Sequence, residues 1–127
     1  YQVYAVRAGE TKQRLARAAL GQTFMAQAPV VLVFCACPRR SAKYGQRGAE
    51  LYCIQDATVA VAYAQLTATD QGLATCWIGA FEDAPVSQVL GLLPGERPVA
   101  MLPIGYAAET PKRTPRRPLA QLVIEKD

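Results

Sequence analysis

The 127-residue sequence contains no histidine. This absence excludes Ser-His-Asp and Cys-His catalysis, a histidine general base and any metal site ligated by histidine. The chemistry of this chain must therefore come from a bound cofactor, or from carboxylate, lysine, tyrosine or cysteine side chains.

The chain also lacks any apolar run that approaches the roughly 18 residues of a membrane-spanning helix. Its first residues, YQVY, do not resemble a signal peptide. We therefore expect a cytoplasmic protein with no membrane partner. Its length and its content of 51% hydrophobic and 19% charged residues are typical of one globular unit, so a single domain over residues 1–127 is predicted.

Cysteine is present four times, but without the CxxC spacing of a zinc or redox pair. All four side chains lie in apolar surroundings: Cys35, Cys37, Cys53 and Cys76. We expect them to be buried, reduced thiols, and we predict no metal site.

Charge is uneven along the chain. The net charge of +4 equals the contribution of four cations in one acid-free stretch, namely Lys112, Arg113, Arg116 and Arg117. This pattern indicates a basic tail that is either simply solvated or binds phosphate. It lacks the interleaved aromatic residues of single-strand binders, so we expect no nucleic-acid partner. A second basic run is interpreted as a solvated loop: Arg39, Arg40, Lys43 and Arg47.

Hydrophobic periodicity predicts alternating strands and helices. The expected strands cover residues 2–7, 30–37, 75–78 and 99–106, with a further strand at 119–125. The expected helices cover residues 11–20, 49–71 and 82–90, with an additional turn at 22–28 and an exposed loop at 38–48. The strand at 30–37 is apolar throughout and suits burial on both faces. Pro103 places the strand at 99–106 at an edge or a bulge.

The segment at 49–71 is apolar around much of its circumference, as expected for a central helix or a subunit interface. We predict that the protein dimerises through its apolar residues: Ile54, Val59, Val61, Tyr63 and Leu66. Asp56 lies within this helix and is expected to accept a structural hydrogen bond rather than to act as a base.

Residues 72–81 (GLATCWIGAF) contain no ionisable side chain other than a thiol, and they include the only tryptophan. Gly79 and Ala80 add little bulk, so the backbone N–H groups of Ile78-Gly79-Ala80 could face a flat apolar ligand. The alternative is a buried strand that ends in a tight turn. Trp77 is expected in the core or in a wall rather than as a stacking partner.

Five segments, in this order, resemble the FMN-dependent nitroreductase family. They are residues 19–22 (ALGQ) with 28–33 (APVVLV), 56–66, 72–81 (GLATCWIGAF), 101–106 (MLPIGY) and 116–119 (RRPL). The resemblance covers nearly the whole chain, and the joint order is more specific than any single segment.

The resemblance implies an α+β fold, with a mixed sheet of about four to five strands flanked by helices and a long central apolar helix. It implies a homodimer with FMN at the subunit interface. Electrons would pass from NAD(P)H to a nitroaromatic, quinone or similar small-molecule acceptor. Because the flavin carries this chemistry, no catalytic residue is assigned. The predicted cofactor-binding residues are Ile78, Gly79, Ala80, Arg116, Arg117 and Gln2. For the basic run at 39–47, contact with NADPH is the alternative to a solvated loop.

The family usually has an N-terminal helical segment with an Arg-Arg-Ser-type motif that holds the flavin phosphate, and no counterpart precedes Tyr1 in this sequence. We therefore expect these residues to correspond to the later two-thirds of the family domain and to bind FMN weakly or not at all by themselves. The competing hypothesis is an inactive, flavin-free nitroreductase-like scaffold or anion-binding module.

Overall fold

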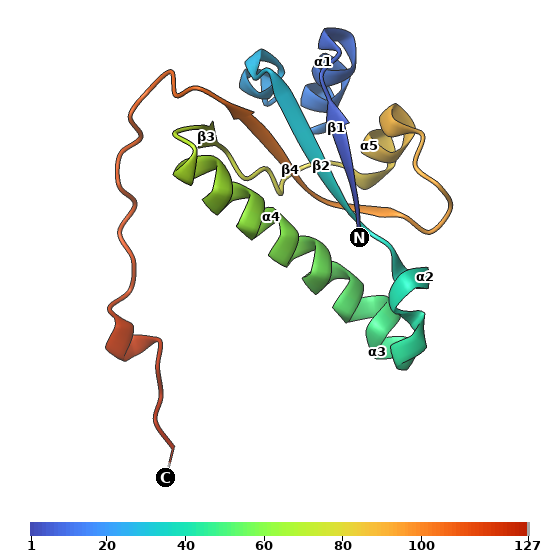
Figure 1. Cartoon of the computed structure of the whole chain (residues 1–127), viewed down its shortest axis with the longest axis vertical. Coiled ribbons are helices and arrows are strands. Elements are labelled where there is room, and N and C mark those ends of the chain that lie inside the picture. Colours follow the sequence, from blue (N-terminus) through green and yellow to red (C-terminus); the bar gives the residue numbers. More distant parts are fainter. Residues whose placement is uncertain (127) are drawn as a thin grey trace.

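A four-stranded antiparallel sheet lies at the centre of the computed structural model, which describes residues 1–126 (Figure 1). The strands are β1 (Gln2–Val6), β2 (Val30–Ala36), β3 (Ala74–Thr75) and β4 (Arg97–Gly105), in the spatial order β1-β2-β4-β3. Each of the three pairings is antiparallel, where a mixture of directions was expected. The α+β class, the four strands and the long helix confirm the expected fold.

Helices cover both faces of this sheet (Figure 1). On one face lie α1 (Gly9–Ala18), the 3₁₀ turn η1 (Thr23–Gln27) and α5 (Asp83–Leu90). The opposite face carries α4 (Cys53–Asp70), which contacts β2 and β4. The turn expected after α1 is confirmed by η1.

The apolar sequence of β2 is explained by burial on both faces. Val31 and Val33 are fully buried in the cluster formed with α1 and α5. Phe34 is 3% exposed and packs against Val61 of α4 in the second cluster. Side chains alternate across a strand, so a strand between two helical layers needs apolar residues at successive positions.

The prediction of an exposed loop at 38–48 was wrong. Residues 38–52 form four short helical turns, namely α2 (Pro38–Ser41), η2 (Ala42–Tyr44), α3 (Gly45–Arg47) and the π-helical η3 (Gly48–Tyr52), which lead directly into α4. Pro38 suits the first turn of a helix. Gly48 allows the turns to pack closely, because a Cβ at this position would collide with the carbonyl oxygen of Ser41. The polar composition concealed these turns because most of their side chains face solvent.

The strand expected at 75–78 is interrupted, and Pro103 explains why. β3 ends at Thr75, and the chain rejoins the sheet only through an isolated bridge between Ile78 and Met101. The backbone N–H and C=O groups of Met101 point toward Ile78. Because these groups alternate in direction along a strand, those of residue 103 point toward the same neighbouring segment. Proline has no N–H to donate, and Cys76 and Trp77 leave the ladder beside it. Pro103 therefore lies within an interior strand, but next to a gap in its pairing.

Residues 106–126 form an exposed tail that leaves the sheet at the C-terminal end of β4 (Figure 1). The strand expected at 119–125 was wrong, since the only regular element in this tail is the 3₁₀ turn η4 (Leu119–Gln121). A strand needs a neighbour for its hydrogen bonds, and this segment runs away from the sheet. Among residues 1–126, no helix combines the length and apolar character needed to cross a membrane.

Candidate functional site

Ile78 fixes the start of the candidate site to the sheet. Its N–H donates to the Met101 oxygen at 2.9 Å, and the Met101 N–H donates to the Ile78 oxygen at 3.0 Å. The side chain of Ile78 is 1% exposed and belongs to the core cluster that contains Met101. The isoleucine is therefore a rigid anchor from which Gly79 and Ala80 emerge at the edge of the sheet.

Gly79 and Ala80 are exposed to solvent. Neither N–H group donates a hydrogen bond to any part of the chain that the structure describes. The carbonyl of Ala80 accepts a hydrogen bond from Gln22 Nε2 at 3.1 Å, which ties the turn to the start of η1. Two backbone donors are thus held in place and available to a ligand.

Trp77 lies against this turn. A Cβ built on Gly79 would lie 3.6 Å from the Trp77 Nε1 atom, an ordinary van der Waals distance. The indole is 39% exposed, so it forms a wall beside the glycine, as expected, rather than a buried core residue.

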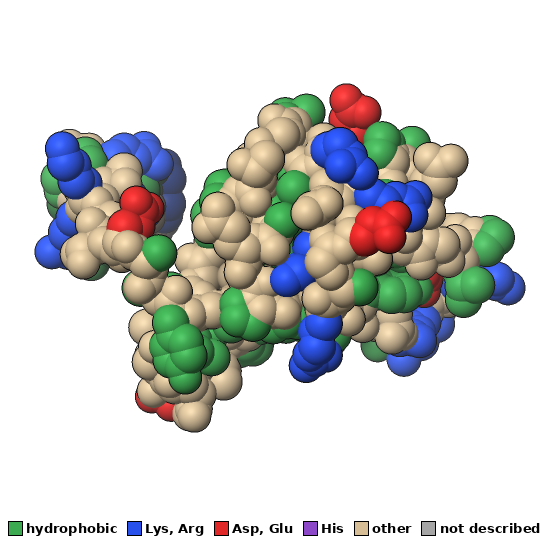
Figure 2. Space-filling view, turned by 90° about the horizontal axis from the view of Figure 1, so that it is seen from above, with side chains coloured by type: hydrophobic (Ala, Val, Ile, Leu, Met, Phe, Trp, Pro, Cys, Tyr) green, Lys and Arg blue, Asp and Glu red, His purple; other side chains and the backbone are tan. Residues whose placement is uncertain are grey.

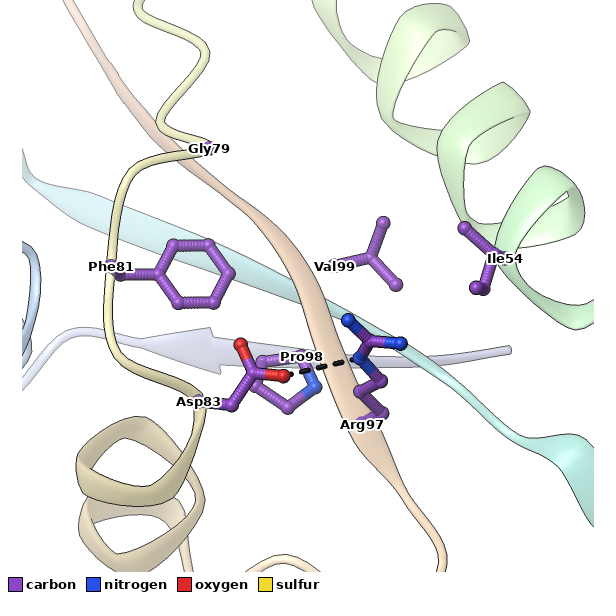
Figure 3. Close-up of a pocket in the computed structure, with 7 residues that line it drawn as sticks. All are labelled: Ile54, Gly79, Phe81, Asp83, Arg97, Pro98 and Val99. Atoms are coloured by element: carbon purple, nitrogen blue, oxygen red, sulfur yellow. Dashed lines mark hydrogen bonds and ion pairs between the residues drawn. The ribbon is translucent and has the colours of Figure 1, made fainter. Parts of the chain in front are cut away.

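A pocket of about 210 Å³ opens beside the same turn (Figure 3). Three segments contribute its lining residues: Ile54 from α4; Gly79, Phe81 and Asp83 from the turn and the start of α5; and Arg97, Pro98 and Val99 from β4. Ligand pockets for whole drug-sized molecules have about 300–1,000 Å³. The pocket therefore suits one ring or the edge of a larger planar group.

An ion pair lies at one side of the pocket. Arg97 Nε donates to Asp83 Oδ2 at 3.1 Å, as the dashed line in Figure 3 marks. The side chains are 63% and 50% exposed, so solvent screens the pair and its contribution to stability is small. Its structural effect is to connect the first turn of α5 to the beginning of β4.

The strongest pKa changes occur away from this pocket. The pKa of Tyr4 is raised to about 12, mainly because its hydroxyl donates to Glu96 Oε2 at 2.6 Å. Burial, with a further contribution from the charge of Glu96, raises the pKa of Cys35 to about 12. Both groups are neutral near pH 7, so neither is a prepared nucleophile or base. The pocket can position a planar group, and the turn beside it offers backbone donors.

The comparison with known proteins agrees with this arrangement. The family model described as the nitroreductase family matches residues 2–106. The chain belongs to the nitroreductase family. The match contains every strand, the helices on both sheet faces and the pocket, but ends where the exposed tail begins.

Related proteins cover the same part of the family fold. A Methanocaldococcus jannaschii protein named as a nitroreductase is 37% identical over 101 residues, which make up 79% of this chain and 50% of that protein. An oxidoreductase structure from Bacteroides fragilis has a TM-score of 0.88 at 28% identity, with 99% of this chain and 56% of that chain covered. The structure of NADPH:FMN oxidoreductase from Vibrio harveyi, solved with NAD⁺, has a TM-score of 0.88 at 25% identity, with 99% of this chain and 58% of that chain covered. The chain thus spans little more than half the length of these relatives.

The predicted site residues are distributed over two regions. Ile78, Gly79 and Ala80 are consecutive in the turn beside the pocket, but only Gly79 lines the pocket, and only Gly79 and Ala80 are exposed. Gln2 pairs with Cys35 on β2, and its side-chain oxygen accepts a hydrogen bond from Arg40 at 3.2 Å. This amide is therefore already engaged by α2.

Arg116 and Arg117 lie in the exposed tail. Arg116 Nη1 donates to the carbonyls of Thr114 and Pro115, at 3.2 and 3.3 Å, within the tail itself. Figure 2 shows the Lys and Arg side chains of the tail gathered on a lobe that stands apart from the body. Within one chain, the structure does not bring these cations to Gly79.

Two smaller expectations have different outcomes. Asp56 Oδ2 accepts a hydrogen bond from Ser41 Oγ at 3.4 Å, which confirms its expected role as an acceptor. The expectation of four buried cysteines was wrong for Cys76, which is exposed because the ladder is interrupted beside Pro103. In residues 1–126, no group of three His, Cys, Asp or Glu side chains could hold a metal ion.

The sequence analysis did not identify the ion pair of Asp83 and Arg97 at the pocket. Asp83 lies within the helix expected at 82–90, and Arg97 precedes the strand expected at 99–106. Fourteen positions separate them, and the contact depends on α5 returning beside β4. The residues around Asp83 or around Arg97 in the sequence therefore gave no indication of this ion pair.

Proposed function

We propose that this chain is part of an FMN-dependent oxidoreductase that passes electrons from NAD(P)H to a nitroaromatic, quinone or similar acceptor. The observation that carries the proposal is the exposed Gly79-Ala80 backbone, with two available N–H donors beside a small pocket that has both apolar and charged lining residues. The oxidoreductase relatives and the family match support the same reaction class. We also propose a cytoplasmic location.

The residues of the chain fit one edge of a flavin ring. A bound FMN would supply the redox chemistry, with the nicotinamide as the hydride donor. Ile78 holds the turn to β4, Gly79 permits close approach, and Phe81 and Val99 form apolar walls. Backbone donors fixed in this way stabilise negative charge on a bound ring without reorganising. The pocket is too small to enclose the whole ring system, so further protein surface must complete the site.

A second copy of the chain supplies this surface in our proposal. The outer face of α4 exposes a stripe of large apolar residues at helical spacing, namely Val59, Tyr63 and Leu66. Packing two such faces together would form a homodimer with the flavin at the interface. The extended tail would then place Arg116 and Arg117 at the flavin phosphate of the neighbouring copy.

The central test is a titration of the isolated chain with FMN, monitored through quenching of Trp77 fluorescence. Trp77 is the only tryptophan and lies against Gly79, so it reports on this turn. We expect saturable quenching with a dissociation constant weaker than about 1 μM, equivalent to a binding free energy of less than about 8 kcal/mol in magnitude. Absence of quenching up to solubility would contradict the proposal and favour the flavin-free scaffold.

The role of Arg116 is tested by the substitution Arg116→Ala. Loss of one charge-assisted phosphate contact should weaken FMN binding about tenfold or more. Riboflavin has no phosphate, so its affinity should remain unchanged. An equal loss for both ligands would show that Arg116 acts on the fold or on the ring instead.

A further inference from the structure

Residues 38–52 present a concentration of cations and tyrosines that the proposed flavin site does not use. We refer to the side chains of Arg39, Lys43, Tyr44, Arg47 and Tyr52 as the platform. Residues 38–52 contain four cations, including Arg40, and a single acid, Glu50. The carboxylate of Glu50 accepts a hydrogen bond from Gln46 Nε2 at 2.9 Å, so it does not pair with a platform cation. The three platform cations are exposed.

The aromatic part of the platform is ordered by contacts among its own members. The rings of Tyr44 and Tyr52 meet edge to face, with centroids 6.1 Å apart and an interplanar angle of 67°. Lys43 Nζ lies 5.0 Å from the Tyr44 centroid, and Arg47 Cζ lies 5.7 Å from that of Tyr52. Tyr44 is nevertheless 60% exposed, so it can still offer surface to a planar ligand.

The backbone beneath the platform is fixed at several points. Ser41 is buried and donates to Asp56 of α4. Gly48 packs so closely on the Ser41 carbonyl that no side chain would fit. Arg40 Nη1 donates to the Tyr1 oxygen at 2.8 Å, which fastens α2 to the start of β1. The exposed cations are therefore carried on a supported structure, which reduces the ordering entropy lost on binding.

The platform lies next to the pocket along the chain. Tyr52 ends η3, and Ile54, two residues later in the first turn of α4, lines the pocket. Figure 1 places α2 and α3 at this end of α4, and Figure 3 shows Ile54 facing the pocket from the same helix. A ligand with one ring at Gly79 and an anionic extension could therefore reach both regions.

We propose that the platform binds the phosphate-bearing adenosine end of the nicotinamide nucleotide and selects NADPH over NADH. This inference rests on the proposed function for its physiological ligand, although the binding can be measured without flavin. Lysine and arginine form charge-assisted hydrogen bonds with phosphate oxygens. An exposed tyrosine ring can stack on a nucleobase. The three platform cations suit a ligand with an additional phosphate, which NADPH carries on its adenosine ribose.

The test is isothermal titration calorimetry of the whole chain with adenosine 2′,5′-bisphosphate, ADP, adenosine and pyrophosphate. We expect affinity to fall from the bisphosphate to ADP to adenosine, and pyrophosphate to bind more weakly than ADP. The double variant Lys43→Gln/Arg47→Gln should weaken bisphosphate binding by at least about tenfold while affecting adenosine little. Both side chains are exposed, so the variant should fold.

Matched variants separate a specific site from bulk charge and from stacking. Arg7→Gln/Arg14→Gln removes the same charge from exposed positions at the end of β1 and on α1, and should leave the affinity unchanged. Tyr44→Ala should weaken ADP and adenosine by a similar factor, of roughly fivefold or more, whereas Tyr44→Phe should retain their affinity. Equal losses in the two double variants, or pyrophosphate binding as tight as ADP, would overturn the inference.

Two other measurements distinguish the possible failures. Nucleotide binding at the platform together with no flavin quenching of Trp77 would leave the platform standing and contradict the proposed oxidoreductase. Flavin quenching with no nucleotide binding would contradict the platform inference and leave the proposed oxidoreductase standing. Tighter binding of a single-stranded oligonucleotide than of the bisphosphate would overturn the inference in favour of a nucleic-acid ligand.

Discussion

Two glycines show how a single substitution can affect either ligand binding or stability. A side chain at Gly79 would meet only Trp77, at 3.6 Å, whereas a Cβ at Gly105 would lie 2.9 Å from Pro29 Cδ. We predict that Gly79→Val leaves the melting temperature within about 2 °C but weakens FMN at least about tenfold, because it crowds two exposed donors. Gly105→Ala should instead destabilise the fold by about 1–3 kcal/mol. Thermal unfolding and Trp77 quenching measure both effects.

A second prediction at this scale concerns Tyr4. Its pKa is raised to about 12 from the ordinary 10.0 by the hydrogen bond to Glu96. Below pH 10 the hydroxyl is protonated in both states, and the full stabilisation is present. Because the folded pKa is the higher one, this stabilisation is lost as the pH rises from about 10 to about 12. Urea denaturation should show a steeper loss of stability over this interval for the wild type than for Tyr4→Phe, and equal slopes would contradict the assignment.

At the scale of elements, α4 has two faces with different tasks. Val61 is fully buried against the sheet, whereas Val59 is 51% exposed. We therefore expect Val61→Ala to lower the free energy of unfolding by about 2 kcal/mol, through lost burial and an added cavity. The matched variant Val59→Ala should change the stability of the monomer by less than about 0.5 kcal/mol. Chemical denaturation at low protein concentration compares the pair.

The same helix shows which elements could be predicted from the sequence. Its length and apolar character gave the correct element, but Val61 was grouped with Val59 as part of a dimer face, although it belongs to the core. The successive apolar residues of β2 likewise identified a strand buried on both sides. Such patterns are reliable because a long helix buries apolar residues at every turn and a long strand buries them at least at every second position, which gives a repeated signal.

Short elements and contacts between distant segments escaped sequence analysis. The turns at 38–52 are stabilised by close backbone packing at Gly48, which leaves no periodic signal. The pairing of Asp83 with Arg97 needs the sheet and α5 to be assembled first. The candidate turn at Gly79 and Ala80 was identified, whereas the relation of Arg116 to that turn depends on a neighbouring copy and stays a prediction.

At the scale of the whole molecule, the exposed stripe of Val59, Tyr63 and Leu66 leads to a prediction about assembly. These side chains are 51–67% exposed on a face that the sheet does not cover. We expect a dimeric mass in light scattering at micromolar concentrations and above. Tyr63→Lys/Leu66→Lys should produce monomers, because charged residues at the centre of an apolar interface cannot be solvated. A monomer for the wild type at all workable concentrations would contradict the dimer.

The position of Pro103 has a consequence for solubility during folding. Open sheet edges offer rows of backbone donors and acceptors to which strands of other molecules can attach, and this is a route to fibrils. Within residues 1–126, the pairing partners of β4 on the side away from β2 are the two-residue β3 and the bridge at Ile78. This side of β4 is therefore incompletely covered against a strand of another molecule. The proline withholds a donor from that row at the gap beside Cys76 and Trp77. The residue that shortens β3 thus also makes this margin a poor template for aggregation.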